Sequence, residues 1–219
     1  MGVQAVIFDL DGTLLNTLED LTDAVNYALT EYHKPERTLE EVRRFVGNGI
    51  AKLVERAVPE GTEPAEQDKI LSAFRNYYGI HCQDKTAPYE GILEILEEFN
   101  KKNIKLAVVS NKADFAVQEL IPVYFGELII VAKGENEAAG IRKKPAPDMV
   151  ETALQELGCT KDKAVYVGDS DVDAMTAANA GLPFIGVSWG FRERSFLEKN
   201  GTVIIADDPK ELLKLVYKF

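Results

Sequence analysis

The stretch Val3-Gln4-Ala5-Val6-Ile7-Phe8-Asp9-Leu10-Asp11-Gly12-Thr13 decides the fold of this 219-residue chain. A short apolar run, typical of a strand buried on both faces, leads directly into two carboxylates spaced by one residue and then a glycine. An ionised carboxylate buried without a partner is strongly destabilising, so Asp9 and Asp11 are expected to bind something. A divalent metal would supply the opposite charge and take hard oxygen ligands. The alternative is a pair of turn aspartates with a helix cap.

The composition excludes several classes of function. The chain has 25 basic and 36 acidic residues and a net charge of −11, which argues against nucleic acid as a partner but not against a small phosphorylated metabolite. Cys82 and Cys159 are far apart, and His33 and His81 stand alone, so neither a zinc site nor histidine catalysis is expected. Without a membrane-length apolar run or a signal-peptide pattern, we expect a reduced, soluble, cytoplasmic protein with no membrane partner. Both a monomer and a homodimer remain open.

Apolar runs recur along the chain with helical patterns between them. The expected strands cover residues 3–8, 105–109, 128–132, 164–167 and 184–187, with an edge strand at 203–205. One helix should follow Gly91, another should end at Gly158 in a glycine C-cap, and a closing helix should span 209–217. This alternation predicts an α/β fold with a doubly wound, mostly parallel sheet.

One segment breaks the alternation. From residue 17 to 85 the apolar spacing is helical throughout, and Thr38 followed by Glu41 predicts a capping box. We therefore expect an α-helical cap domain over 17–85, inserted into an α/β catalytic core formed by 1–16 and 86–219. The hinges between them should lie near 15–17 and 85–88.

Polar residues follow four expected strands or their loops, at the sheet edge where ligands bind in open α/β sheets. They are Asp9 and Asp11; Ser110 and Asn111; Lys144 in Arg142-Lys143-Lys144-Pro145; and Asp169, Asp171 and Asp173 in Gly168-Asp169-Ser170-Asp171-Val172-Asp173. Each has a plainer interpretation as a helix cap, a solvated lysine or a polar helix start. Their occurrence together on one predicted edge favours a site.

This order of motifs resembles the haloacid dehalogenase superfamily of phosphotransferases over essentially the whole chain. The insertion between the first and second motifs resembles the subclass with a small helical cap, and Phe45-Val46-Gly47-Asn48-Gly49-Ile50 is similar to phosphoglycolate phosphatases. Asn16 departs from the aspartate of many relatives, at a position near the cap hinge.

The resemblance implies aspartyl-phosphate catalysis with Mg²⁺. Asp9 would attack the phosphoryl group, while Mg²⁺ cancels the repulsion between the two anions. Asp11 would protonate the leaving alcohol and then deprotonate the hydrolytic water, and its backbone carbonyl would touch the metal. Asp169 would complete the metal site.

The phosphoryl oxygens would be held by Ser110, Lys144 and the amide hydrogen of Asn111. Lys144 is favoured because it directly precedes Pro145, as in the pattern of the family that the chain resembles, with Lys143 as the alternative. Asp173 would orient the metal ligands or Lys144, and Asp171 would be a helix-start or supporting residue.

Substrate choice is expected in the cap. The loop Gly47-Asn48-Gly49 could approach the substrate closely, although a plain inter-helix turn fits equally. Arg43 or Arg44 could reach a substrate carboxylate, and 188–192 could line the rim, with Trp189 either there or in the packing.

The predicted enzyme is a phosphatase for a small phosphorylated acid such as 2-phosphoglycolate. Retention of Asp11 argues against a dehalogenase, and a phosphonate hydrolase would need Lys52 as a Schiff base. The alternatives are a β-phosphoglucomutase-like sugar phosphomutase, a pyrophosphatase or nucleotidase and, from another class, a non-catalytic phosphate-binding module.

Overall fold

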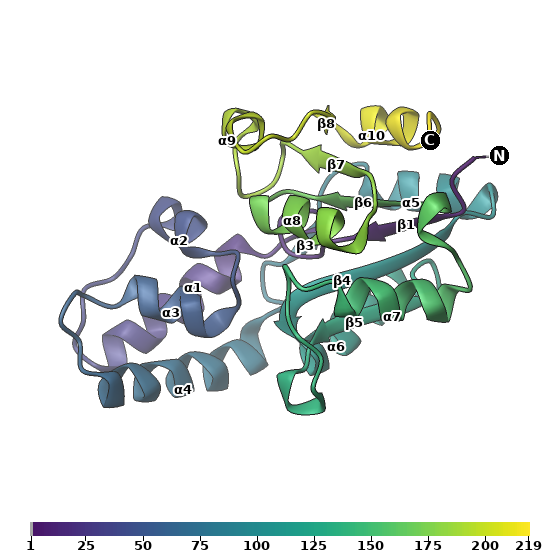
Figure 1. Ribbon diagram of the computed structural model, residues 1–219. Coiled ribbons are helices and arrows are strands. Elements are labelled where there is room, and N and C mark those ends of the chain that lie inside the picture. The colour runs from purple at the N-terminus through teal and green to yellow at the C-terminus, as the bar shows by residue number, and fades with distance from the viewer. Residues whose placement is uncertain (1) are drawn as a thin grey trace. The chain divides into compact units, whose positions relative to one another are not determined.

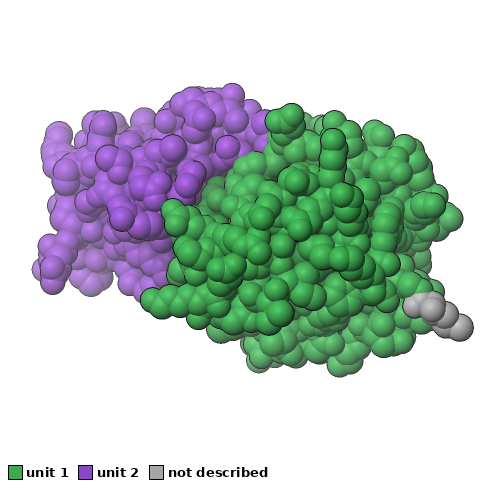
Figure 2. Space-filling view, turned by 90° about the horizontal axis from the view of Figure 1, so that it is seen from above, with its two compact units in different colours: residues 1–15, 88–219 green, residues 16–87 purple. Residues whose placement is uncertain are grey.

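The computed structural model describes residues 2–219 and divides into two compact units (Figure 2). One consists of Met1–Leu15 and Pro88–Phe219, and the other of Asn16–Ala87. The segment expected to be all-helical, 17–85, lies inside the second unit. Each unit is described by itself below.

The first unit is built on a six-stranded parallel sheet with the order β5-β4-β1-β6-β7-β8 (Figure 1). Its strands are β1 (Ala5–Phe8), β4 (Lys105–Ala113), β5 (Val131–Glu135), β6 (Ala164–Gly168), β7 (Phe184–Val187) and β8 (Ile205–Ala206). The predicted doubly wound α/β fold is thereby confirmed. β1 is central, and all four of its residues are buried, which is why the sequence there is continuously apolar.

Helices cover both faces of this sheet. They are α5 (Ile92–Lys101), α6 (Asp114–Phe125), α7 (Asp148–Leu157), α8 (Asp171–Ala180), α9 (Arg194–Lys199) and α10 (Pro209–Val216), with short 3₁₀ turns at Glu137–Ala139 and Lys161–Lys163. The buried side chains of α7 and α8 form one apolar cluster with alternate residues of β1, β4 and β6, such as Ile7. The next residue, Phe8, faces the other way and meets Phe99 of α5 at 6.4 Å between ring centroids. This alternation is the period-two pattern of a strand covered on both faces.

Two strands differ from their sequence-based limits. The strand expected over 128–132 lies at Val131–Glu135, because Leu128 is still in the turn that closes on Phe125 and pairing begins only where Ala107 meets Val131. β4 continues to Ala113, four residues past its expected end, with a register shift after Val109. The polar run that follows Val109 therefore belongs to the strand and is held in extended backbone.

Several local predictions are confirmed. α7 ends at Gly158 with a φ of 63°, a left-handed conformation that glycine adopts without strain. In the second unit, Thr38 and Glu41 form the reciprocal capping box at the start of α2. A second capping box, between Ser170 and Asp173 at the start of α8, was not expected from the sequence.

The second unit contains four helices, and a pair of short strands lies where the chain enters and leaves it. The helices are α1 (Leu18–Glu31), α2 (Leu39–Phe45), α3 (Ile50–Ala57) and α4 (Pro64–His81), and the short strands β2 (Leu15–Asn16) and β3 (Ala87–Pro88) pair with each other. Asp20 ties the start of α1 to the end of the unit, accepting bonds from the backbone of Lys85 at 2.9 Å and of Thr86 at 2.8 Å. None of the helices described over residues 2–219 is long and apolar enough to cross a membrane.

Candidate active site

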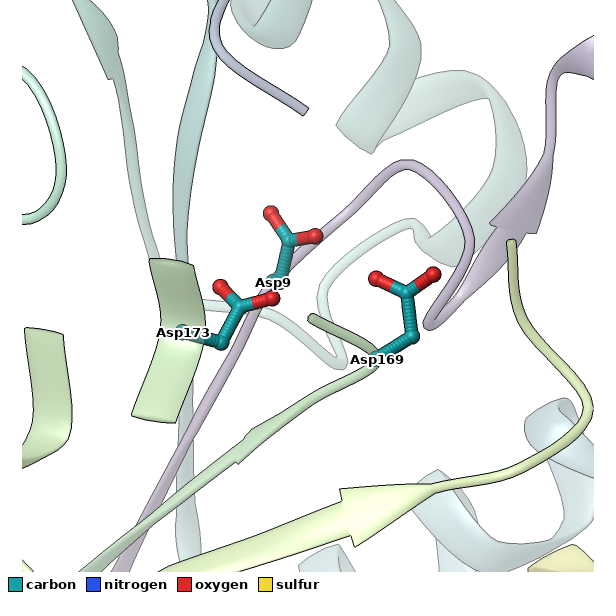
Figure 3. A group of neighbouring side chains, drawn as sticks. All are labelled: Asp9, Asp169 and Asp173. Atoms are coloured by element: carbon teal, nitrogen blue, oxygen red, sulfur yellow. The ribbon is translucent and has the colours of Figure 1, made fainter. Parts of the chain in front are cut away.

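Three buried aspartates converge at the carboxyl edge of the sheet (Figure 3). Asp9 follows β1, Asp169 follows β6, and Asp173 lies in the first turn of α8. β1 and β6 are paired neighbours, and the Asp9 amide donates to the carbonyl of Val167 at 2.9 Å. One carboxylate oxygen from each aspartate lies within 4.8 Å of the others. The sheet therefore brings Asp9 next to two acids that lie 160 and 164 residues further along the sequence.

Lys144 links two of these acids. Its Nζ donates to Oδ1 of Asp9 at 2.6 Å and to Oδ1 of Asp173 at 2.7 Å. The side chain is only 4 % exposed, and burial alone would lower the pKa of the ammonium, but the carboxylates of Asp173 and Asp9 outweigh burial and raise it well above its usual value. Lys144 therefore stays charged.

Asn111 places this lysine. Its side-chain Oδ1 accepts from the backbone amide of Lys144 at 2.7 Å, and its Nδ2 donates to the backbone carbonyl of Lys144 at 3.2 Å. The Lys144–Pro145 peptide is cis. The neighbouring Lys143 is exposed to solvent, so Lys144 is the lysine that the fold directs to Asp9.

The charges of the cluster do not balance. Three carboxylates and one ammonium leave two negative charges among side chains that are almost fully buried. Burial, followed by the charge of Asp173, raises the pKa of Asp9 well above its ordinary value and that of Asp169 to about 7. A bound divalent cation would offset both charges, and carboxylate oxygens are the ligands that Mg²⁺ prefers. The residues present fit such a metal.

Asp173 is not free to be a metal ligand, since donors already occupy both of its oxygens. Oδ1 accepts from Lys144 and, at 3.2 Å, from the hydroxyl of Tyr166. Oδ2 accepts from the amide of Ser170 at 3.1 Å and from its hydroxyl at 2.5 Å. The remaining candidates for direct contact with a cation are Asp9 and Asp169, and Asp173 instead holds Lys144 in place. Tyr166 looks like an ordinary core residue in the sequence and was missed.

A loop after β7 packs directly on Asp169. The amide of Phe191 donates to Oδ2 of Asp169 at 2.6 Å. A Cβ atom at Gly190 would overlap the side chain of Asp169 and the carbonyl oxygen of Gly12, so only glycine fits there. The indole of Trp189 donates to the carbonyl of Thr13 at 3.1 Å. The loop thus supports both the turn after β1 and the turn after β6. Trp189 contributes a hydrogen bond here, in addition to the packing role that its sequence suggests.

The last acid of the first motif, Asp11, pairs with a different lysine. Nζ of Lys112 lies 3.1 Å and 3.4 Å from the two carboxylate oxygens of Asp11. The side chain of Asp11 is 17 % exposed, whereas that of Lys112 is 2 % exposed. Ser110 accepts a bond from the backbone amide of Lys112 through its hydroxyl at 3.2 Å. Sequence reasoning missed Lys112, although its position directly after the polar pair at the end of an apolar strand was a usable signal.

The other candidate residues lie elsewhere. Asp171 begins α8 and lines an open hollow of about 590 Å³ beside Met175, away from the acid cluster. In the second unit, Lys52 is exposed and bonds Glu55 at 2.5 Å, as expected for a solvated helix lysine. Arg43 lies near Glu40 in α2.

The proposed specificity loop is in the second unit as well. Gly47 and Gly49 have backbone φ angles of 131° and 84°, which residues with a side chain rarely adopt. Arg56 braces the loop, donating to the carbonyl of Phe45 at 2.7 Å and to Oδ1 of Asn48 at 2.8 Å. The glycines are therefore required by a defined, supported turn.

The fold and its acid cluster define an α/β protein with a buried acidic site at the carboxyl edge of a parallel sheet. Residues 6–187 match the family model described as haloacid dehalogenase-like hydrolase. The chain therefore belongs to the haloacid dehalogenase-like hydrolase family, and its relatives make it a phosphatase. It is 31% identical to the phosphoglycolate phosphatase of Mesorhizobium japonicum over 209 residues, 94% of this chain and 92% of that protein.

Two further similarities extend over nearly the whole chain. A crystal structure from Lactobacillus delbrueckii subsp. bulgaricus, provisionally named a phosphoglycolate phosphatase, superposes with a TM-score of 0.95 at 38% identity and full coverage of both chains. The pyrophosphatase PpaX of Bacillus cereus is 26% identical over 221 residues, 99% of this chain and 97% of that protein.

Proposed function

We propose that the protein is a Mg²⁺-dependent phosphomonoester hydrolase that acts through an aspartyl-phosphate on Asp9. The observation that carries this proposal is the buried cluster of Asp9, Asp169 and Asp173 with Lys144, which retains two uncompensated negative charges. Asp9, Asp169 and the backbone carbonyl of Asp11 would hold the cation. When bound there, Mg²⁺ would neutralise charge on the transferring phosphoryl group.

Each residue of the proposed site has a role in this reaction. An oxygen of Asp9 attacks phosphorus, and the ion pair with Lys144 keeps that carboxylate from rotating away. Asp11 gives a proton to the leaving alcohol and later takes one from the water that cleaves the aspartyl-phosphate. The hydroxyl of Ser110, the amide of Asn111 and the ammonium of Lys144 hold the phosphoryl oxygens, where preorganised donors stabilise the charge of the transition state.

The second unit supplies the substrate choice in this proposal. Residues 17–85 are the cap, and the braced turn Gly47-Asn48-Gly49 is its specificity loop. The names of the relatives with 31% identity favour 2-phosphoglycolate, a small phosphorylated acid, as the substrate. The cap would exclude bulk water while Asp9 attacks.

A substrate panel with Mg²⁺ tests the proposal. The panel compares 2-phosphoglycolate with sugar phosphates, nucleoside monophosphates and pyrophosphate. We expect kcat/KM to be highest for 2-phosphoglycolate, activity to vanish on chelation or in Asp9→Ala, and phosphate label trapped during turnover to be on Asp9. Label on another residue, or full activity in Asp9→Ala, would refute the mechanism, whereas equal rates across the panel would refute only the substrate.

Pyrophosphate hydrolysis is the second candidate, because the similarity to PpaX covers 99% of this chain. The same residues could serve it, with phosphate as the leaving group. A kcat/KM for pyrophosphate above that for 2-phosphoglycolate would make it the preferred assignment.

A further inference from the structure

Lys112 is a second buried lysine that the mechanism above does not use. Its side chain is 2 % exposed, and buried lysines are rare unless the surroundings compensate their charge. Lys144 serves Asp9 and Asp173, but the ammonium of Lys112 is directed to Asp11. The fold thus assigns a separate lysine to the acid that faces the leaving group in the proposed mechanism.

The local backbone is arranged to hold Lys112 there. The residue lies in the irregular end of β4, after the register shift, and its amide is fixed by the hydroxyl of Ser110. On the adjacent strand, a Cβ at Gly134 would overlap the backbone of Asp114 and approach the carbonyl of Lys112, so the absence of a side chain allows β5 to pack closely against this segment. A strand end is more rigid than a surface loop, which suits a group that must present a charge at a set position.

We propose that Lys112 is the positioning residue of Asp11, and that it holds the carboxyl group where it can pass a proton to the leaving alcohol. In that step the bond from Asp9 to phosphorus forms, the bond from phosphorus to the ester oxygen breaks, and the electron pair left on that oxygen takes the proton of Asp11. Asp11 becomes a carboxylate as the proton leaves. Asp11 takes that proton from solvent before the step, and Lys112, with its Nζ 3.1 Å from Oδ1, fixes the position of the carboxyl group and keeps its own protons.

This inference rests on the proposed function, and leaving-group dependence tests it. Phenyl phosphate and p-nitrophenyl phosphate have the same ring, but p-nitrophenolate departs readily without a proton whereas phenolate gains much more from one. General acids contribute about 10²–10⁴-fold, and we expect Lys112→Met to remove part of this, lowering kcat/KM for phenyl phosphate about 10- to 100-fold. The loss for p-nitrophenyl phosphate should be less than about threefold, because kcat/KM reports the step in which the leaving group departs.

Three variants control for structure. Lys112→Arg keeps the charge and should recover most of the phenyl phosphate activity. Lys133→Met removes a lysine of the neighbouring strand that pairs with Glu156 at 2.7 Å, and should leave both substrates unaffected. If circular dichroism shows that Lys112→Met does not fold, Lys112→Gln replaces it with a polar, uncharged side chain.

A double-mutant cycle separates action through Asp11 from any other role. In the Asp11→Asn background no acid remains, so Lys112→Met should cause no further selective loss for phenyl phosphate. Equal losses for both substrates, or the same selective loss in the Asp11→Asn background, would overturn the role of Lys112 while leaving the phosphatase intact. Absence of Mg²⁺-dependent hydrolysis of either ester by the wild type would overturn the proposed function and this inference with it.

Discussion

Protons and Mg²⁺ should compete for Asp169. The pKa of this carboxyl is raised to about 7 in the metal-free protein, first by burial and then by the charge of Asp173. A cation binds the ionised form, so below pH 7 each bound Mg²⁺ must displace a proton. One displaced proton lowers the apparent affinity tenfold per pH unit, and from pH 7 to pH 5 this amounts to about 100-fold, or about 3 kcal/mol. The raised pKa of Asp9 acts in the same direction.

The raised pKa of Asp169 also determines how the stability of the metal-free protein changes with pH. In the unfolded chain the carboxyl of Asp169 has its ordinary pKa of 3.8, whereas in the folded protein it is about 7. The folded state therefore holds the proton more tightly, and this contribution is fully present below pH 3.8 and is lost as pH rises to about 7. Saturating Mg²⁺ should reverse the loss, because it stabilises the ionised folded state.

Isothermal titration with Mg²⁺ at pH 5.5, 6.5 and 7.5, in two buffers of different ionisation enthalpy, measures both the affinity and the protons released. We expect the dissociation constant to rise by about tenfold or more for each pH unit below 7, with protons released on binding at the acid end. Asp169→Asn should lose most of the binding, whereas the matched variant Asp171→Asn, at the half-buried start of α8, should keep the wild-type profile. A dissociation constant that does not change between pH 5.5 and 7.5, or binding without proton release, would refute the reasoning.

Three further substitutions test other parts of the structure. Asp173→Asn removes one of the two carboxylates that hold Lys144 and should lower kcat more than about 100-fold in a steady-state assay; a wild-type kcat would contradict its anchoring role. Gly190→Ala places a Cβ atom where it overlaps Asp169 and Gly12, and should lower the free energy of unfolding by about 1–3 kcal/mol. It should also weaken Mg²⁺ binding, as measured by calorimetry, and an unchanged Mg²⁺ affinity would rule out the bracing role of the loop. Asp20→Ala leaves the backbone amides of Lys85 and Thr86 without their acceptor and should lower the free energy of unfolding of the helical unit by about 1–3 kcal/mol. Urea denaturation monitored by circular dichroism measures this change, and an unchanged midpoint would show that these bonds are dispensable.

The errors of the sequence analysis share a cause. The polar residues after Val109 predict that the strand ends there. In the structure, pairing with β5 extends β4 to Ala113 and brings Lys112 to Asp11. Tyr166 lies in an expected strand and its ring is fully buried, but its hydroxyl reaches Asp173, which nothing in the sequence indicates. In both cases the partner is distant in the sequence, and local composition carries no information about it.

The sequence by itself determined the elements and the order of the chemistry. Continuous apolar runs specify strands covered on both faces, and the polar residues that follow them must lie at one edge once the sheet is parallel. Hence the α/β fold and the acids at positions 9, 169 and 173 could be inferred in advance, and the resemblance to the family added the preference for Lys144 over Lys143. Only the tertiary structure decided that Lys112 meets Asp11 and that Tyr166 and Ser170 occupy the oxygens of Asp173 beside Lys144. The first of these outcomes depends on a distance of a few ångströms between residues more than a hundred positions apart, and such distances arise from strand register and helix packing, which local sequence patterns do not encode.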